Sequence, residues 1–307
     1  MDLALVNCFL RVAEFGSINR AAADLEMTQP ALARRIAALE HDLRVQLLVR
    51  DARGVRLTEA GVALVNGARP ILRQAELLRA EIGRQVKTQV AIGLPFSMNR
   101  LVTAPFASDH LRTDSAVSLR VYEGFIHHLR EWAHQSLIDV AILDDRDDDS
   151  SQLERHPLIR EQLFVVGNHE TALSLDRPIQ AHELGQYRLI LPGRPNLIRL
   201  SVETYLKQNG EKFRRAADAE TLALCLSLVN DGHGYTVMPY CALYEFPSLK
   251  GIKAAPIGDL SITWAMYINK ARRHSAGVRQ TAQALREAMT RLVQDGRWAL
   301  AQVIDEG

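Results

Sequence analysis

The sequence predicts an α/β protein with an all-α N-terminal domain, a long linking helix and two α/β lobes. Three observations support this prediction. Residues 3–43 repeat apolar side chains every three or four positions, as amphipathic helices do. Residues 57–82 continue such a repeat on one narrow stripe. Beyond residue 88, short apolar runs alternate with helical patterns, which is typical of sheets covered by helices.

The composition sets the class of protein. The chain has 307 residues, enough for two or three domains, and its 47% hydrophobic and 24% charged residues are ordinary for a globular protein. No apolar run is long enough to span a membrane, and the N-terminus lacks the features of a signal peptide. The three cysteines, Cys8, Cys225 and Cys241, have no metal-ligand spacing. We therefore expect a cytoplasmic protein with reduced thiols, no metal and no cofactor.

Local signals mark the first three helices. Gly16 ends a helix over residues 3–15, and Ser17 can cap the next helix, INRAAADL. After a turn at Glu26-Met27, Thr28 can cap the third helix through its hydroxyl group. Two helices, a short turn and a third helix form the helix-turn-helix arrangement. Residues 47–49 and 55–57 then flank a turn, which predicts a β-hairpin wing.

The third helix has one apolar and one slim polar face. Its buried stripe is Leu32, Ile36, Leu39 and Leu43, and its opposite face presents Pro30, Arg34, Ala37, Ala38 and His41. Such a face suits a DNA major groove, with Arg34 contacting a base. The arginines at positions 50, 53 and 56 could contact phosphates or a minor groove. By the pattern alone, a solvated surface helix is the alternative.

The long helix begins near Thr58 and carries a stripe with a period of 3.5 residues, the period of a coiled coil. The predicted dimer seam consists of Leu57, Gly61, Leu64, Ala68, Ile71, Ala75, Leu78 and Ile82. Small residues at 61, 68 and 75 would let a partner helix approach closely, and Pro70 predicts a kink. A helix lying on its own domain is the alternative, and the strict period favours a dimer.

Two lobes follow a linker at residues 83–88. The predicted strands are residues 90–94, 117–122, 140–143, 188–191, 235–239 and 264–268, and the last helix is residues 275–294. Ligands of such sheets bind beyond the carboxyl ends of the strands, often between lobes. The acidic run 144–151 lacks the glycine turn and ligand spacing of a calcium loop and is expected to be a solvated loop.

Residues 9–61, FLRVAEFGSINRAAADLEMTQPALARRIAALEHDLRVQLLVRDARGVRLTEAG, resemble the DNA-binding domain of the LysR-type transcriptional regulators. The most specific parts are GSINRAAADLEMTQPALARRIAALE and the wing from Arg50 to Gly61. The resemblance extends over the whole chain. It implies a winged helix-turn-helix at residues 1–58, a dimerisation helix and hinge at 59–87, and a periplasmic-binding-protein-like effector domain at 88–307. We place lobe I at about 88–160 and 267–295, and lobe II at about 161–266.

The resemblance also implies the sites. We expect DNA contacts from Ser17, Asn19, Arg20, Thr28, Gln29, Pro30, Ala31, Arg34, Arg35, Arg50, Arg53 and Arg56. We expect effector contacts from Phe96, Ser97, Met98, Gly124, Ile126, Asp144, Arg194, Pro195 and Gly234. Relatives that bind aromatic-derived dicarboxylates often have threonine and arginine where this chain has Ile126 and Asp144. The expected effector is therefore not a simple dicarboxylate, or it is held mainly by Ser97 and Arg194.

Two departures from the family pattern are visible. Ala33 replaces a common serine and removes one potential contact with DNA. Arg44 replaces a common glycine after the recognition helix, which costs about 1 kcal/mol if that position needs a positive φ. The expected partners are promoter or operator DNA, a small-molecule effector, further copies of the chain as a homodimer or homotetramer, and RNA polymerase.

Other functions fit less well. An enzyme could use His127, His128, Ser97 and Asp139, but no motif joins a nucleophile, a base and an orienting acid. A solute receptor would need a signal peptide, and an architectural DNA-binding protein would leave the two lobes without a role. Cys225 and Cys241 could form a redox switch, as in peroxide-sensing relatives. Their surroundings do not match those relatives, and Cys225 is expected in the core.

Overall fold

The computed structural model describes residues 2–51, 54–82, 88–113, 115–146, 152–244 and 251–304. The chain forms two compact units: the first contains the residues up to Thr88, and the second contains most of the chain beyond it. None of the helices in these ranges is long and apolar enough to cross a membrane.

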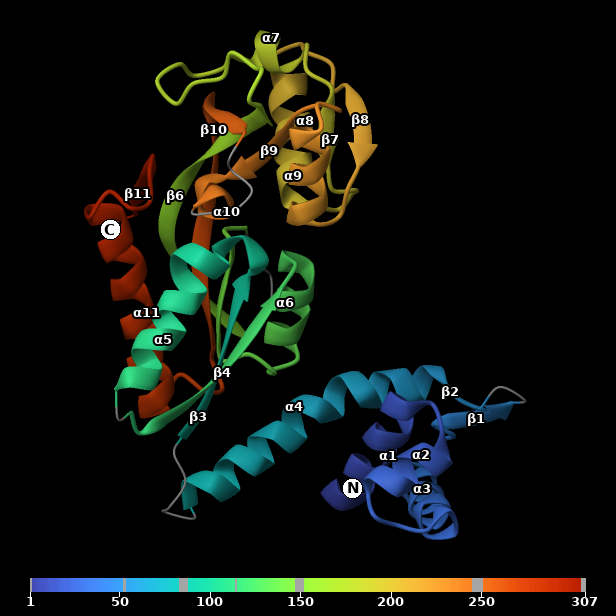
Figure 1. Ribbon diagram of the computed structural model, residues 1–307. Helices are drawn as coiled ribbons and strands as arrows, with labels where there is room; N and C mark the ends of the chain where they lie inside the picture. The colour runs from blue at the N-terminus through green and yellow to red at the C-terminus, as the bar shows by residue number, and fades with distance from the viewer. Residues whose placement is uncertain are drawn as a thin grey trace. The chain divides into compact units, whose positions relative to one another are not determined.

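Three helices and a hairpin make up the first unit, together with a long helix (Figure 1). Gly16 ends the first helix with a φ of 58°, and the Ser17 hydroxyl accepts a hydrogen bond from the backbone N–H of Arg20, as predicted. The hairpin pairs Leu48 with Leu57. The elements are α1 (Leu3–Phe15), α2 (Ile18–Asp24), α3 (Gln29–Leu43), β1 (Leu48–Asp51), β2 (Gly54–Leu57) and α4 (Glu59–Ile82).

The predicted cap of α3 is wrong in one respect. Thr28 holds the N-cap position, but its hydroxyl makes no capping hydrogen bond. The backbone N–H groups of Ala31 and Leu32 donate to the Thr28 carbonyl instead. Pro30 explains the difference, because it occupies the second helical position and has no N–H to offer to the hydroxyl. The Thr28 side chain is exposed and remains available to another partner.

The dimer seam predicted on α4 divides into two parts. Leu57, Leu64 and the buried Ala68 pack in the core of the first unit with α1 and α3. A Cβ at Gly61 would lie 2.2 Å from the carbonyl oxygen of Leu47, so this glycine brings α4 close to its own domain. The prediction that positions 61 and 68 serve a partner helix is therefore wrong.

The later part of the seam does not pack in this way. Ile71 is 45% exposed, and Ala75 is half-buried. The side chains of Leu78 and Ile82 lie outside the described residues. Pro70 stands inside the helix, and the predicted kink stays a prediction.

One sheet of seven strands organises the second unit. Its order is β11-β6-β10-β5-β3-β4, and β9 joins it by pairing with β6. Figure 1 shows α5 and α11 on one side of the lobe I strands and α6 on the other. The lobe I elements are β3 (Thr88–Pro95), two short helical turns (Phe96–Met98 and Asn99–Thr103), α5 (Ala104–Arg112), β4 (Val117–Gly124), α6 (Ile126–His134), β5 (Val140–Asp144), α11 (Ala276–Gln294) and β11 (Ala301–Val303).

Two long antiparallel strands, β6 (Leu153–Asn168) and β10 (Ile252–Asn269), run through both lobes (Figure 1). Their lobe I halves pair residues 153–162 with 261–269, and their lobe II halves pair 164–168 with 252–256. Residues 257–260 form an irregularity between the two halves. β6 was not predicted from the sequence, and residues 261–266, expected in lobe II, pair within lobe I.

Lobe II is smaller and has its own two-stranded parallel sheet of β7 and β8. A single bridge between Leu189 and Tyr235 connects this sheet to the segment that leads into β9. The lobe II elements are α7 (Ala181–Leu184), β7 (Leu189–Leu191), α8 (Leu197–Gln208), β8 (Arg215–Asp218), α9 (Leu222–Asn230), β9 (Thr236–Pro239) and α10 (Tyr240–Leu243).

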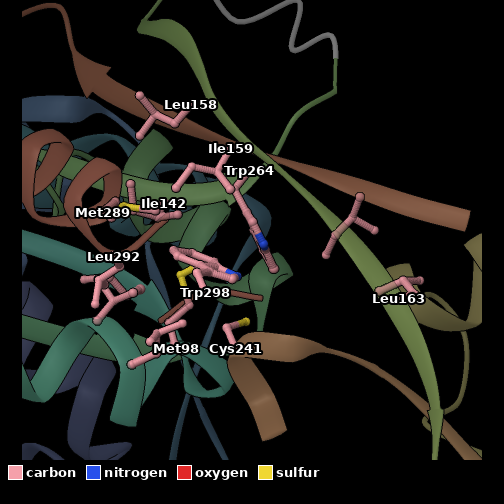
Figure 2. Close-up of a cluster of buried hydrophobic side chains, with 14 of the residues drawn as sticks. Met98, Ile142, Leu158, Ile159, Leu163, Cys241, Trp264, Met289, Leu292 and Trp298 are labelled. Carbon is pink, nitrogen blue, oxygen red and sulfur yellow. The ribbon is translucent and has the colours of Figure 1, made fainter. Parts of the chain in front are cut away.

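The largest apolar core of the second unit surrounds Trp264 and Trp298, which are both 1% exposed. Figure 2 shows the two indoles among Met98, Ile142 and Cys241. Burying an indole stabilises the fold strongly, provided that its N–H finds an acceptor. That acceptor is the buried carboxylate of Glu161.

Candidate functional sites

The outward face of α3 is the first candidate site. Pro30, Arg34, Ala37, Ala38 and His41 are exposed, whereas Leu32, Ile36 and Leu39 are buried, as predicted. The Arg34 Nε donates to the carbonyl of Pro30, which holds its guanidinium along the first turn of the helix. A slim exposed face with one arginine near the helix N-terminus fits the dimensions of a major groove.

The remaining residues predicted to contact DNA are placed differently. Asn19, Gln29 and Arg56 are exposed, Ala31 and Ser17 are half-buried, and Arg20 lies over the Phe15 ring. Arg35 turns toward α1, where its Nη1 lies 3.6 Å from the Cys8 sulfur. Ala52 and Arg53 lie outside the described residues, as does the side chain of Arg50.

A carboxylate joins the wing to α3. The Glu40 Oε1 accepts hydrogen bonds from the backbone N–H groups of Leu47 (2.7 Å) and Leu48 (3.1 Å). Charge-assisted bonds of this kind are about twice as strong as neutral ones. The hairpin is therefore fixed relative to the exposed face of α3, although Glu40 was not singled out in the sequence.

A cavity of about 600 Å³ between the two lobes is the second candidate site. Aromatic and aliphatic side chains dominate its walls, as is usual for small-molecule sites. Phe96 and Phe125 meet edge to face there, with their ring centroids 5.5 Å apart. The lining consists of residues 95–97, 124–127, 195–198, 220–223 and 236–239, together with Arg146, Pro192, Cys225, Ala242 and Trp264.

Five of the nine predicted effector residues line this cavity: Phe96, Ser97, Gly124, Ile126 and Pro195. The other four do not. Met98 is fully buried in the core shown in Figure 2. At Gly234, a Cβ would lie 2.6 Å from the carbonyl of Arg188, so this glycine serves close packing against β7.

The two charged residues in the prediction are held elsewhere. Arg194 bonds to Glu203 on α8, with its Nε at 3.0 Å, and is not part of the cavity wall. Burial raises the pKa of Glu203, but hydrogen bonds from Arg199 and Arg194 outweigh this and leave the pKa lowered. The prediction that Arg194 holds the effector is not supported by this geometry.

Asp144 ends β5 and is only 4% exposed. Its carboxylate receives Arg130 Nη2 at 2.8 Å and Arg146 Nε at 2.5 Å. The first residue of the acidic run is therefore buried and paired, contrary to the expected solvated loop, and residues 147–151 lie outside the described part. Arg146 extends from this pair to the cavity wall. Arg146 and Glu220, the charged lining residues on lobe I and lobe II, were not predicted from the sequence.

A buried carboxylate lies behind the cavity. Glu161 on β6 is fully buried and accepts hydrogen bonds from the backbone N–H of Cys241 (2.7 Å) and from both indoles: Trp298 Nε1 at 2.7 Å and Trp264 Nε1 at 2.5 Å. Burial raises the pKa of Glu161, and the three donors oppose this shift only in part. Because Trp264 also lines the cavity, Glu161 fixes one of its walls.

The two thiols of the second unit are protected. Burial raises the pKa of Cys225 to about 11 and raises that of Cys241 well above its usual range. The nucleophilic thiolate is scarce under such conditions. Cys225 belongs to the core, as predicted, and also contributes to the cavity wall. Within the described ranges, no three His, Cys, Asp or Glu side chains are grouped so that they could hold a metal ion.

Comparison with known proteins covers nearly the whole chain. Residues 3–62 match the family described as "Bacterial regulatory helix-turn-helix protein, lysR family", and residues 83–290 match "LysR substrate binding domain". The nitrogen assimilation regulatory protein nac of Klebsiella aerogenes is 27% identical over 297 residues, which are 95% of each chain. The transcriptional regulator BbuR of Bordetella bronchiseptica is 25% identical, over 97% of this chain and 93% of its own.

Solved structures show the same fold over the full length. CbnR, a LysR family transcriptional regulator, superposes with a TM-score of 0.70 at 21% identity, over 94% of this chain and 99% of its own. A full-length variant of OxyR from Pseudomonas aeruginosa has a TM-score of 0.71 at 20% identity, over 100% of this chain and 99% of its own. CbnR has also been solved in complex with its target DNA.

Proposed function

This chain belongs to the LysR family of transcriptional regulators, and on that premise we propose that it reads operator DNA with α3 and responds to a small molecule held between its lobes. The exposed face of α3 carries the first part of the proposal. Its residues Pro30, Arg34, Ala37, Ala38 and His41 are exposed on a helix whose other face is anchored in the core. Gln29 precedes this face and Arg34 lies at its centre, where base contacts are made.

The cavity supports the second part. It is enclosed by segments of both lobes, and the paired strands β6 and β10 run through both lobes. A ligand that contacts both lobes favours the arrangement in which they are close, and this differential affinity can change DNA binding or bending. Regulation, not catalysis, is the role we propose, in the cytoplasm where the DNA lies.

The proposal includes assembly. A homodimer through the later part of α4, and a homotetramer formed by two such dimers, would place recognition helices on half-sites roughly one helical turn apart. At an activated promoter the bound tetramer would contact RNA polymerase. A ligand-independent architectural protein is the alternative, and it would leave the apolar cavity unused.

The variant Arg34→Ala tests whether α3 recognises the operator sequence. With an operator selected from random duplexes, we expect binding to weaken by about 1–3 kcal/mol and the preference for one base to relax. Arg11→Ala is the matched control, because Arg11 belongs to α1 and its guanidinium bonds to Glu14 and Asp24 of the same domain. Equal weakening on all sequences would show that Arg34 contacts a phosphate and does not read a base.

A further inference from the structure

The cavity between the lobes carries two opposite charges on opposite walls. Among its described lining residues, Arg146 is the single arginine or lysine and Glu220 is the single carboxylate. Arg146 comes from lobe I, where it follows β5, and Glu220 comes from lobe II, where it precedes α9. We infer that the ligand of this cavity is an amphoteric compound, an α-amino acid with an apolar side chain; the inference rests on the proposed function of the cavity.

Arg146 is oriented by its surroundings and keeps donor groups for a ligand. Its backbone carbonyl accepts a hydrogen bond from the Tyr267 hydroxyl (2.9 Å), which fixes the main chain beside β10. The guanidinium uses Nε to hold the buried Asp144, which also receives Arg130. A guanidinium bound through Nε presents its two terminal amino groups on another edge, and that edge matches a second carboxylate.

Glu220 provides the opposite charge. One of its oxygens accepts the backbone N–H of Gly193 at 3.0 Å, which holds the carboxylate at the cavity. The N-terminus of α9 begins next to it, with Thr221 as its cap. The positive end of that helix alone would favour an anion. With Glu220 in front of it, this wall presents a carboxylate whose remaining lone pairs suit an ammonium group.

The two charges together exclude simpler ligands. A ligand that fills the cavity removes water from both side chains, and a charge that loses water without gaining a partner costs free energy. A monoanion would leave Glu220 with only its backbone N–H donor and no charged partner. An amine would leave the terminal amino groups of Arg146, which are not used by Asp144, without a carboxylate. A ligand with both a carboxylate and an ammonium group pairs with each of them.

The apolar walls define the rest of the ligand. Phe96 and Phe125 lie on lobe I, Leu197 and Ile198 lie on lobe II, and Trp264 forms part of the wall between them. His127, the other titratable side chain here besides Cys225, is exposed and stacks on Phe125. A volume of about 600 Å³ has room for an aromatic or branched side chain with ordered water.

Calorimetric titration of the full-length protein tests the inference with matched compounds. The amino acids are L-phenylalanine, L-leucine and L-methionine. The controls are 3-phenylpropionate, which lacks the amine, 2-phenylethylamine, which lacks the carboxylate, and phthalate, which has two carboxylates. We expect at least one amino acid to bind, with an affinity about tenfold or more above that of every control.

Variants assign the two charged groups. Arg146→Gln and Glu220→Gln should each weaken amino-acid binding about tenfold or more, and Glu220→Gln should leave or improve the binding of 3-phenylpropionate. The matched controls are Arg194→Gln and Glu170→Gln, which change the same types of side chain outside the cavity and should leave the affinity unchanged.

The inference is overturned if 3-phenylpropionate or phthalate binds as tightly as the best amino acid, or if none of the three amino acids binds. The proposed function is tested separately by footprinting on operator DNA. A compound that binds in the cavity without changing the footprint counts against regulation through this site, and leaves the class of ligand standing.

Discussion

Two residues that follow helices of the helix-turn-helix adopt a backbone conformation that costs L-amino acids free energy. Glu26 has a φ of 52° and follows α2, and Arg44 has a φ of 54° and follows α3. Glycine adopts this region without a steric penalty. The arginine at position 44, which departs from the family pattern, is therefore accommodated at a cost in stability.

Arg44→Gly should raise the free energy of unfolding by up to about 1 kcal/mol, because relief of the positive φ outweighs the added freedom of the unfolded chain. Urea denaturation of the wild type and the variant measures this change in the free energy of unfolding. Ala38→Gly, at an exposed position inside α3, is a control of opposite sign and should lower stability by about 1 kcal/mol. A loss of stability in Arg44→Gly would mean that the arginine side chain makes a compensating contact.

Glu161 makes stability depend on pH. Its pKa is raised in the folded protein, mainly by burial, although three N–H donors oppose the shift. Below the ordinary carboxyl pKa, Glu161 is protonated in both the folded and the unfolded protein, so its full contribution to the stability of the folded protein is present. As the pH rises, the unfolded chain ionises first, and the folded state loses stability until the raised pKa is passed.

The melting temperature of Glu161→Gln should therefore change less between about pH 5 and about pH 8 than that of the wild type. The variant should also be less stable at the acidic end, because an amide has one acceptor oxygen for donors that now use two. Glu170→Gln is the control, because it removes a carboxylate whose side chain is exposed. Parallel pH profiles of the wild type and Glu161→Gln would contradict the assignment.

At the scale of elements, α4 has two different environments along one stripe. The residues up to Ala68 pack on their own unit, and Ile71 is exposed. The alternation that predicted a coiled coil was real, but periodicity alone does not say which neighbour covers each turn. A helix in water gains little from an exposed residue such as Ile71 unless a partner covers it.

Ile71→Glu should therefore weaken self-association strongly, by about 2 kcal/mol or more for each dimer, because a charge would be buried at the seam. Sedimentation velocity at several concentrations measures the change. Val62→Glu is the control, since Val62 is equally exposed on α4 but lies off the predicted seam. An unchanged oligomer in Ile71→Glu would place the contact between copies elsewhere.

The sequence predicted elements well where local signals determine them. The ends of α1 and α2 follow from Gly16 and Ser17, and the buried stripe of α3 follows from its period. β6 was missed because its two halves face different neighbours, so its burial does not alternate regularly. The position of the cavity was predicted, since strand ends indicate where a site lies, and five of the nine expected residues line it. Strand ends do not show that Arg194 turns to Glu203 or that Arg146 leaves an acidic run to reach the wall.

At the scale of the second unit, the two lobes are joined through the irregular segment of β10. Gly258 lies there with a φ of 34°, and its carbonyl accepts a hydrogen bond from the Gln162 side chain. A Cβ at this position would lie 2.6 Å from the Tyr205 hydroxyl. This glycine therefore allows α8 to approach the crossing between the lobes.

Gly258→Ala should lower the free energy of unfolding by about 1–3 kcal/mol, because it adds both backbone strain and a steric contact. Differential scanning calorimetry measures the loss. Gly67→Ala on α4 is the control, because a Cβ there meets nothing within 4 Å, and it should be neutral or stabilising. Equal stability of Gly258→Ala and the wild type would show that the segment relaxes freely.

The paired strands have a further consequence for how such a protein can be rebuilt. The chain enters lobe II along β6 and returns along β10, and Gln162 pairs with Ser261 where it does so. Lobe II is therefore an insertion whose two ends are neighbours on one ladder. A short turn between positions 162 and 261 could replace it, or the corresponding segment of another protein could be transplanted there, without cutting any other strand of lobe I. The half of the cavity that contains Glu220 could therefore be exchanged while the strands of lobe I stay unchanged.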